Sequence, residues 1–351
     1  MPPSDPSDLL RYSRQMLFER IGEEGQRRIR SARVTLIGCG ALGNVVASML
    51  VRAGVGFLRI CDRDEIELNN LQRQSLFDEE DIRRGLPKAI AAAEKLGRAN
   101  SDVELEPVVI DVNYRNIEQL VEGADLICDG TDNFETRYLV NDTAVAHGIP
   151  WIYNAIVGAS GLVMPVLPGQ TPCLRCVFEN APPPDISPTC DTAGVIGPAV
   201  GIVASWQALE ALKILSDRLE DVCRQLISID AWAGRAVHIN TIRANSGRGC
   251  VCCGDRRFEY LEGAIGGGAT MLCGRDAVQV QPPTSNVKID FARVAERIAS
   301  VAAAPPRHTA HMLTVQIGEH TITLFPDGRA IIKGAATPEE ARTLYAKYIG
   351  G

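Results

Sequence analysis

Short apolar runs alternate with stretches of helical periodicity along the first 150 residues of the chain. Continuous or alternating apolar runs indicate strands, and apolar residues at i, i+3 and i+4 indicate helices. Strands are predicted over 33–38, 57–62, 104–109 and 126–129. Helices are predicted between and after them, over 43–53, 87–99, 115–122 and 133–147. This alternation predicts an α/β fold, in which helices cover a parallel sheet.

The pattern continues with strands at 151–155 and 161–166, a helix at 204–215, and closing strands at 227–230 and 236–241. Beyond Gly254 the alternation of strands and helices is interrupted by two stretches that break regular structure, the glycine-rich "GAIGGGAT" and "AAAPPRH". Strands at 277–281, 312–317, 321–325 and 330–333, with helices at 291–302 and 338–348, predict a small α+β domain. The predicted organisation is a disordered N-terminus (1–10), a main domain (11–254), a glycine-rich linker (255–275) and a C-terminal domain (276–351).

Composition places the 351-residue chain among globular proteins, with 46% hydrophobic and 23% charged residues. Its net charge of −7 disfavours nucleic acid as the main partner. The uncharged stretch from Ala193 to Leu209 is at the short limit for a membrane span and is crowded with glycine, so we expect a loop entering a buried helix. The N-terminus lacks the pattern of a secretion signal, which predicts a cytoplasmic protein without a membrane segment.

Three glycines follow the first predicted strand in "GCGALG", namely Gly38, Gly40 and Gly43. A strand, a G-x-G-x-x-G loop and a helix are typical of a Rossmann-like, doubly wound nucleotide-binding fold. Asp62 ends the next strand, where a carboxylate can bind ribose hydroxyls. The glycine loop and Asp62 fit NAD and ATP equally well.

The residues beyond the next strand ends favour ATP. The stretch after Asp62 and the start of the following helix supply carboxylate, amide, guanidinium and ammonium groups: Asp64, Asn69, Asn70, Arg73, Gln74 and Lys88. The fourth strand is followed by "DGTDNFETR", with Asp129, Asp132 and Arg137. Cationic donors with a carboxylate for Mg²⁺ suit a triphosphate, whereas a nicotinamide needs an apolar slot.

Two C-x-x-C pairs, Cys173 with Cys176 and Cys250 with Cys253, predict a zinc site. Four thiolates leave no open coordination position, so the zinc would be structural and would join distant parts of the chain. Whether Cys252 replaces Cys250 or Cys253 is left open, although equal spacing of the two pairs favours Cys250 and Cys253.

The chain resembles the ThiF/MoeB/HesA adenylyltransferases, the bacterial relatives of ubiquitin-activating enzymes. The resemblance runs in order from about Arg11 to Cys253. It rests on "RYSRQ", "GCGALG", "DRDEIELNNLQRQ", "DGTDNFETR", "PCLRC", "CDTAGVIGPAVG" and the late C-x-x-C. It implies adenylation, with Mg-ATP, of the C-terminal glycine of a ubiquitin-like sulfur carrier for thiamine, molybdopterin or related sulfur-transfer pathways.

The resemblance also implies residue roles. The three glycines form the nucleotide loop, Asp62 holds the ribose, and Asp64 lies near the phosphates or metal. Asn70, Arg73, Gln74 and Lys88 bind the triphosphate, and Asp132 binds magnesium. Arg14 resembles an arginine that reaches into the neighbouring protomer's ATP site, which implies a homodimer. Cys190 is a candidate for a persulfide or acyl link to the carrier, and that covalent role stays open.

No rhodanese loop is recognisable in the C-terminal segment, so the sulfur is expected from a separate cysteine desulfurase or persulfide protein. Two alternatives remain at this stage. One is adenylation of another carboxylate, on a peptide or a modified tRNA base. The other is an NAD-dependent oxidoreductase, which retention of NAD on purification would support.

Overall fold

The computed structural model describes residues 6–181, 190–241, 249–265, 271–272, 277–280 and 289–349. The chain divides into two compact units. Unit 1 comprises Met1–Pro183 and Gly194–Gly266, and unit 2 comprises Pro184–Ala193 and Gly267–Gly351.

Unit 1 is built on an eight-stranded sheet in the order β3-β2-β1-β4-β5-β6-β7-β8. The strands are β1 (Arg33–Ile37), β2 (Phe57–Asp62), β3 (Glu104–Val109), β4 (Leu126–Asp129), β5 (Trp151–Val157), β6 (Ser160–Val166), β7 (Leu226–Asp230) and β8 (Arg235–Ile239). The pairs from β3 to β5 are parallel, and the pairs from β5 to β8 are antiparallel. The carboxyl ends of β1, β2 and β4 therefore meet at one edge of the sheet, as the predicted doubly wound fold requires.

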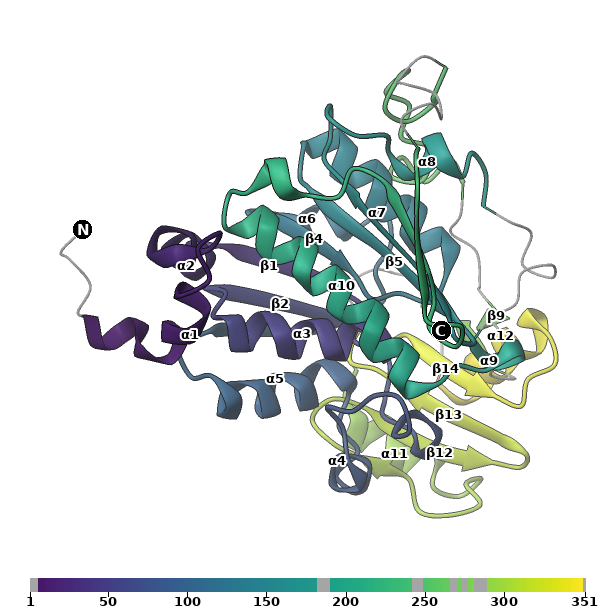
Figure 1. The fold of residues 1–351 in the computed structure, drawn as a ribbon. Coiled ribbons are helices and arrows are strands. Elements are labelled where there is room, and N and C mark those ends of the chain that lie inside the picture. Colours follow the sequence, from purple (N-terminus) through teal and green to yellow (C-terminus); the bar gives the residue numbers. More distant parts are fainter. Residues whose placement is uncertain are drawn as a thin grey trace. The chain divides into compact units, whose positions relative to one another are not determined.

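Helices cover both faces of this sheet (Figure 1). One face carries α3 (Ala41–Ala53), α5 (Lys88–Ala99) and α10 (Gly197–Leu215), and the other carries α6 (Ile117–Val121) and α7 (Phe134–His147). The shorter helices are η1 (Pro6–Tyr12), α1 (Ser13–Met16), α2 (Gly22–Ser31), η2 (Leu68–Asn70), α4 (Glu79–Arg84), α8 (Leu174–Val177) and η3 (Leu219–Asp221). The predicted α/β fold, with helices on both faces of a mostly parallel sheet, is confirmed.

Helix α10 begins earlier than predicted. The sequence pattern gives a helix only from Ala204, because three glycines precede it, but the helix starts at Gly197 with a proline in its first turn. A proline there is compatible with a helix, since the first N–H groups have no intrahelical partner. No helix among the described residues combines the length and apolar character needed to cross a membrane.

The N-terminus is more ordered than predicted. Residues 6–12 form η1, although disorder was expected over 1–10; residues 1–5 lie outside the described part. Leu9 and Tyr12 are both buried, and the Tyr12 hydroxyl accepts a hydrogen bond from Asn100 Nδ2 at 2.8 Å. Two apolar anchors outweigh the polar, proline-rich composition that suggested disorder.

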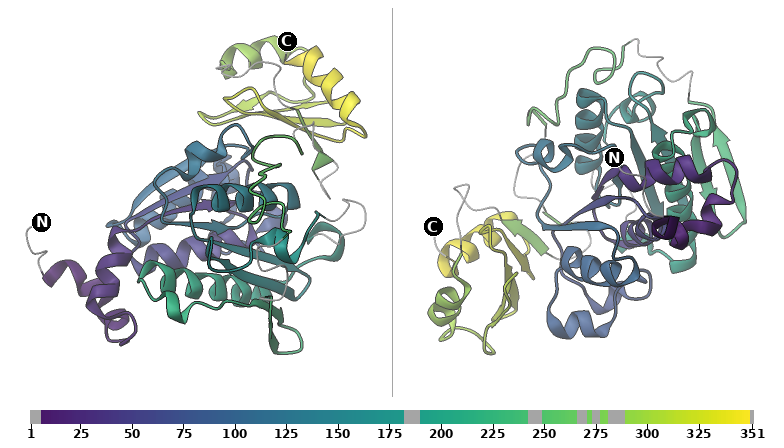
Figure 2. Two further views of the ribbon diagram at one scale, coloured as in Figure 1. Left: turned by 90° about the horizontal axis from the view of Figure 1, so that it is seen from above. Right: turned by 90° about the vertical axis from the view of Figure 1, so that its left-hand side faces the viewer.

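Unit 2 contains a six-stranded antiparallel sheet in the order β11-β12-β13-β14-β10-β9. Its strands are β9 (Met271–Leu272), β10 (Ala277–Val280), β11 (Arg307–His308), β12 (Leu313–Ile317), β13 (His320–Leu324) and β14 (Ala330–Lys333). The helices α11 (Phe291–Ile298) and α12 (Pro338–Tyr348) pack on one face of this sheet and share its apolar core (Figure 2). The short helix α9 (Cys190–Ala193) also belongs to this unit.

The division between the units differs from the predicted one. Residues 255–265 belong to unit 1 and do not act as a linker. Tyr260 is buried in the core of unit 1, with its ring centroid 5.1 Å from that of Tyr138, and Gly263 packs against the Tyr114 ring. The glycines of "GAIGGGAT" suggested a linker, but the apolar residues just before them fold onto unit 1.

Candidate nucleotide and metal sites

Gly38 and Gly40 lie in the loop between β1 and α3, and Gly43 lies in the first turn of α3; this turn and the loop approach the loop after β4. Gly38 has a φ of +89°, and a Cβ there would lie 2.6 Å from the Gly130 carbonyl oxygen. A Cβ on Gly43 would overlap the Gly38 carbonyl. In contrast, the nearest atom to a Cβ on Gly40 is the Gly130 oxygen at 3.9 Å. Backbone packing thus requires glycine at 38 and 43, whereas the space in front of Gly40 and the N-terminus of α3 is open to an anionic ligand.

Asp62 ends β2 and fixes this loop through its carboxylate. Oδ2 accepts a hydrogen bond from the Cys39 N–H at 2.6 Å, and Oδ1 accepts one from the Asp64 N–H at 2.7 Å. The pKa of Asp62 is raised above its usual value because the carboxyl group is buried, although the positive charge of Lys88 opposes this shift. A carboxylate can accept about four hydrogen bonds, so these two leave capacity for ribose hydroxyls.

Lys88 is the first residue of α5, and its side chain is only 2% exposed. Its Nζ lies 3.0 Å from Asp64 Oδ2, and its N–H donates to the Asp64 carbonyl at 2.9 Å. The structure therefore brings together two residues that the sequence assigned to the phosphates and metal. The ion pair places a buried cation beside Asp62, directly behind the glycine loop.

Arg63 belongs to the same cluster but was missed by the sequence analysis. Its Nη1 lies 2.7 Å from Asp111 Oδ1, and its Nε lies 3.8 Å from Asp64 Oδ1. The negative charge of Asp132 also interacts with the guanidinium and raises its pKa. Burial alone would lower the pKa of Arg63, but these carboxylates outweigh it and hold the pKa above its usual value. Three loops, after β2, β3 and β4, meet at this guanidinium. Its place in "DRDE", between two assigned acids, was the available signal.

The loop at 67–74 holds the remaining predicted triphosphate residues. Asn70 is buried, and its Oδ1 accepts a hydrogen bond from the Glu67 N–H at 3.1 Å. Arg73 is half-buried, and its Nη1 donates to the Asn69 carbonyl at 2.8 Å. Gln74 is 3% exposed, yet its Oε1 accepts no hydrogen bond from any residue that the structure describes. A buried amide without a full set of partners is typical of a position that binds a ligand or water.

The start of α10 is attached to this loop. Gln72 Nε2 donates to the Val195 carbonyl at 3.3 Å, and a Cβ on Gly197 would lie 2.7 Å from the Gln72 carbonyl oxygen. Glycine at 197 therefore permits the close approach. The N-terminus of a 19-residue helix, which carries partial positive charge, lies next to Arg73.

The acids after β4 take different positions. Asp129 is fully buried, with its Oδ2 3.3 Å from Arg137 Nε, and it accepts hydrogen bonds from both the N–H and the hydroxyl of Thr131. Burial raises the pKa of Asp129, and Arg137 lowers it. Asp132 is exposed, and its carboxylate forms no hydrogen bond or ion pair with the described residues. The Asp129–Arg137 pair thus holds the loop, while Asp132 remains accessible to a metal.

Arg14 and Cys190 come from elements other than these strand-end loops. Arg14 lies on α1 and is exposed, and no hydrogen bond or ion pair joins its side chain to the described part of the chain. Cys190 begins α9 in unit 2, and its side chain lies outside the described residues.

The cysteines of the two C-x-x-C pairs come together in unit 1. All four sulfurs of Cys173, Cys176, Cys250 and Cys253 lie within 4.8 Å of one another. The Sγ–Sγ distances are 3.8 Å for 173–176, 3.6 Å for 173–250 and 3.3 Å for 176–253. A tetrahedron of 2.3 Å Zn–S bonds has edges of about 3.8 Å, so the arrangement fits zinc.

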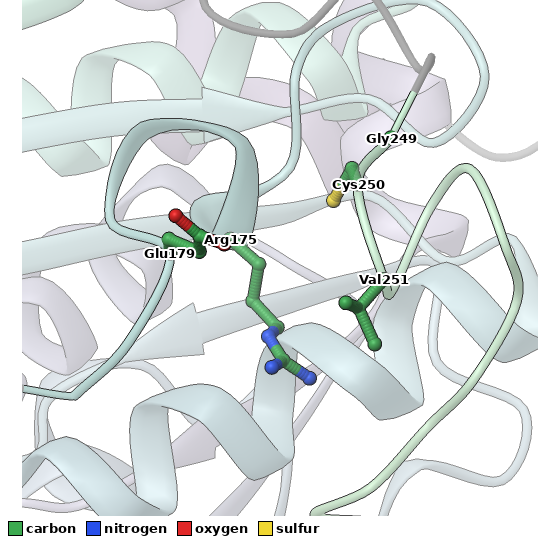
Figure 3. Close-up of a pocket in the computed structure, with 5 residues that line it drawn as sticks. All are labelled: Arg175, Glu179, Gly249, Cys250 and Val251. Carbon is green, nitrogen blue, oxygen red and sulfur yellow. The ribbon is translucent and has the colours of Figure 1, made fainter.

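A small recess adjoins this cysteine cluster (Figure 3). It is lined by Arg175, Glu179, Gly249, Cys250 and Val251. The Arg175 guanidinium is buried and donates from Nη2 to Glu259 at 3.0 Å. None of these lining residues belongs to the glycine loop or the strand-end charges, so the recess is a feature of the metal site.

Cys39, Cys61 and Cys128 are fully buried on the strands and the glycine loop. Burial raises the pKa of all three thiols, for Cys61 to about 12. Such thiols are poor nucleophiles at neutral pH, which fits a packing role for these three cysteines.

A glycine loop at a strand-end edge, backed by buried cations and acids, defines a nucleotide-binding domain of the doubly wound class. Comparison with known proteins is more specific. Residues 12–252 match the model of the ThiF family. The chain is 42% identical, over 347 residues, to the sulfur carrier protein ThiS adenylyltransferase of Bacillus subtilis (strain 168), covering 97% of this chain and 99% of that protein.

Two other relatives are the SAMP-activating enzyme E1 of Haloferax volcanii and the adenylyltransferase and sulfurtransferase MOCS3 of Danio rerio. The first is 38% identical, covering 74% of this chain and 93% of the relative, and the second is 36% identical, covering 76% and 58%. Among solved structures, the microcin C7 biosynthetic enzyme MccB in complex with N-formylated MccA shares the fold. It has a TM-score of 0.63 at 24% identity, covering 72% of this chain and 77% of that one.

The chain therefore belongs to the ThiF family, and it is an adenylyltransferase. The NAD-dependent oxidoreductase considered from the sequence is thereby set aside.

Proposed function

We propose that the chain uses ATP to adenylate the C-terminal glycine carboxylate of a ubiquitin-like sulfur carrier protein ending in Gly-Gly. The relative named sulfur carrier protein ThiS adenylyltransferase, 42% identical to this chain, supports this substrate. The observation that carries the proposal is the edge where the glycine loop, the Lys88–Asp64 pair and the loop of Asn70, Arg73 and Gln74 meet.

The reaction joins two anions, so the chain must lower their repulsion and hold them in line. A carboxylate oxygen of the carrier attacks the α-phosphorus, the bond to the bridging oxygen breaks, and pyrophosphate leaves. Lys88 and Arg73 supply fixed positive charge for the phosphates, and Asn70 and Gln74 supply amide donors. The open N-terminus of α3 at Gly40 receives the phosphates, while Asp62 orients the ribose.

Asp132 and Asp64 are the residues we assign to magnesium. Their carboxylate oxygens are the ligand type that Mg²⁺ prefers, and Asp132 is accessible. When bound, the ion supplies positive charge that neutralises the triphosphate. Arg63 pairs with Asp64 and interacts electrostatically with Asp132, so its positive charge offsets part of their mutual repulsion.

We assign Cys173, Cys176, Cys250 and Cys253 as ligands of a structural zinc ion. The sulfur separations fit tetrahedral coordination, and three of the four cysteines are buried. The two pairs come from segments about 75 residues apart, so zinc would cross-link the start of α8 to the segment at 250–253.

We further propose a homodimer in which Arg14 completes the partner's nucleotide site. The layer of α3 and α10 exposes large apolar side chains, Met49 at 36%, Ile202 at 45% and Leu209 at 50%. A second copy covering this layer would bury them. The sulfur is delivered by a separate desulfurase or persulfide protein, and Cys190 is the residue of this chain that would form any covalent link.

Carrier-dependent exchange of labelled pyrophosphate into ATP tests the activity. We expect exchange with a purified carrier ending in Gly-Gly and its loss when the terminal glycine is removed. Exchange supported instead by a short unrelated peptide or by tRNA would contradict the proposed substrate.

Mixing variants tests the shared site. Arg14→Ala and Asp132→Ala chains should each be inactive, but when co-expressed with different tags the mixture should recover about one quarter of the wild-type exchange. Half of the dimers are then mixed, and each mixed dimer has one intact site. No recovery, with mixed dimers present, would contradict a shared site.

A further inference from the structure

Helix α7 carries two adjacent polar residues, Asn141 and Asp142, that are fully buried in the middle of the helix. Both bind segments that carry cysteines. Asn141 Oδ1 accepts a hydrogen bond from the Leu174 N–H at 2.8 Å, and Asp142 Oδ2 accepts one from the Tyr260 N–H at 2.9 Å. Buried polar groups that reach outside their own helix usually fix another segment in place.

Asn141 reaches both halves of the cysteine cluster with one side chain. Leu174 lies between Cys173 and Cys176, and Asn141 Nδ2 donates to Cys252 Sγ at 3.3 Å, which lies between Cys250 and Cys253. Its partners are 33 and 111 residues away along the chain. The amide therefore sets the spacing of the two pairs before any metal joins them.

Cys252 is fully buried but is not one of the four sulfurs that gather within 4.8 Å. Its Sγ instead accepts the hydrogen bond from Asn141 Nδ2. Four thiolates already complete a tetrahedral zinc site, so a fifth sulfur has no open coordination position.

We propose that Asn141 is the positioning residue of the zinc site and that Cys252 is an outer thiol bonded to it, not a zinc ligand. The inference rests on the zinc site proposed above. Partners outside the ligand set orient metal ligands, and their loss typically weakens binding by about 10- to 100-fold.

The rate of zinc release to a chromogenic chelator, at fixed reductant concentration, tests the role of Asn141. Asn141→Leu keeps the volume and removes both hydrogen bonds, and release should be about 10- to 100-fold faster than in the wild type. Thr143→Val is the matched control, because Thr143 is also buried on α7 and donates only to the Leu139 carbonyl. Its release rate should stay within about twofold of the wild type.

Asn141→Asp provides a second variant if Asn141→Leu does not fold. It keeps the acceptor for Leu174 but replaces the donor to Cys252 with a negative charge, so release should again be faster. A wild-type release rate in a folded Asn141 variant would overturn the proposal. A wild-type protein that binds no zinc would overturn the zinc site instead, so the two failures are distinguishable.

Cobalt substitution tests the role of Cys252. The intensity of the sulfur-to-cobalt absorption scales with the number of bound thiolates. Cys252→Ala should keep the full wild-type intensity, whereas Cys250→Ala should lose about a quarter of it. The reverse result would make Cys252 a ligand.

Discussion

The proposed nucleotide site at the carboxyl ends of β1, β2 and β4, called the nucleotide edge below, and the cluster of four cysteines both lie in unit 1. Their side chains are held together by opposite kinds of interaction. At the nucleotide edge, charges of opposite sign are already paired: Lys88 with Asp64, and Asp129 with Arg137. In the cluster, four cysteine thiols lie close together, and each one is a negatively charged thiolate when it binds a metal. The strand-end residues can therefore keep their arrangement without a ligand, whereas we expect the cysteine cluster to depend on the proposed zinc ion.

Helix α7 joins the two regions. Arg137 in its first half pairs with Asp129 behind the loop of Asp132, and Asn141, one turn later, binds both cysteine segments. Loss of the metal should thus disturb the residues of the nucleotide edge through α7. Loss of a charged side chain at the nucleotide edge should leave the cysteine cluster intact. The predictions below test this asymmetry.

The largest effect is expected from Asp132→Ala. Removing this exposed carboxylate, the proposed magnesium ligand, should lower carrier-dependent pyrophosphate exchange by about 100-fold or more. The Tm should stay close to that of the wild type, because Asp132 forms no hydrogen bond or ion pair with the described residues. Glu122→Ala, an exposed acid at the end of α6, is the control and should exchange normally. Wild-type exchange in the Asp132 variant would refute the assigned metal ligand.

Zinc removal should have the next largest effect, and on stability first. A chelator with reductant should lower the Tm of unit 1 by about 10 °C, because zinc binds only the folded arrangement. Exchange activity should fall with it, through α7. Calorimetry with and without added zinc measures this, and an unchanged Tm after verified zinc loss would show that the cluster does not hold the fold.

Substitutions of Gly43, in the first turn of α3, and of Gly40, just before that helix, should have different effects on folding and on nucleotide binding. Gly43→Ala overlaps the Gly38 carbonyl and should destabilise the fold by about 1–3 kcal/mol. Gly40→Ala meets no protein atom closer than 3.9 Å, so stability should be kept while the KM for ATP rises by about tenfold. Chemical denaturation and exchange kinetics check both, and equal effects of the two substitutions would argue against an open phosphate position at Gly40.

Cys190→Ala should have the smallest effect on adenylation. Attack by the carrier carboxylate needs no enzyme nucleophile, so exchange should stay within about twofold of the wild type. Thiocarboxylate formation with a sulfur donor, followed by mass spectrometry of the carrier, is the step at which this variant could differ. A strong loss of exchange would place Cys190 in the adenylation step itself.

Most of the fold was readable from the sequence because its elements have strong local signals. Strands β2, β3 and β4 begin and end at the predicted residues, since each is a short run of continuous or alternating apolar residues bounded by polar loops. The failures were tertiary effects. Leu9 and Tyr12 order a polar N-terminus, and packing against Gln72 lets α10 start at a glycine. Neither contact can be deduced from the amino-acid composition of these segments.

The sites were predictable to different degrees for the same reason. Ligand spacing alone identified the four cysteines that the structure brings together. Partners distant in the sequence could not be identified in this way: the pairing of Arg63 with Asp111 and the two contacts of Asn141 depend on the folded chain.

A structure with a non-hydrolysable ATP analogue and magnesium tests the central claim most directly. The account predicts that Lys88 Nζ and the Arg73 guanidinium lie about 3 Å from phosphate oxygens, with Asp132 on the metal. A nucleotide bound elsewhere, or one whose phosphates leave both cations facing solvent, would contradict it.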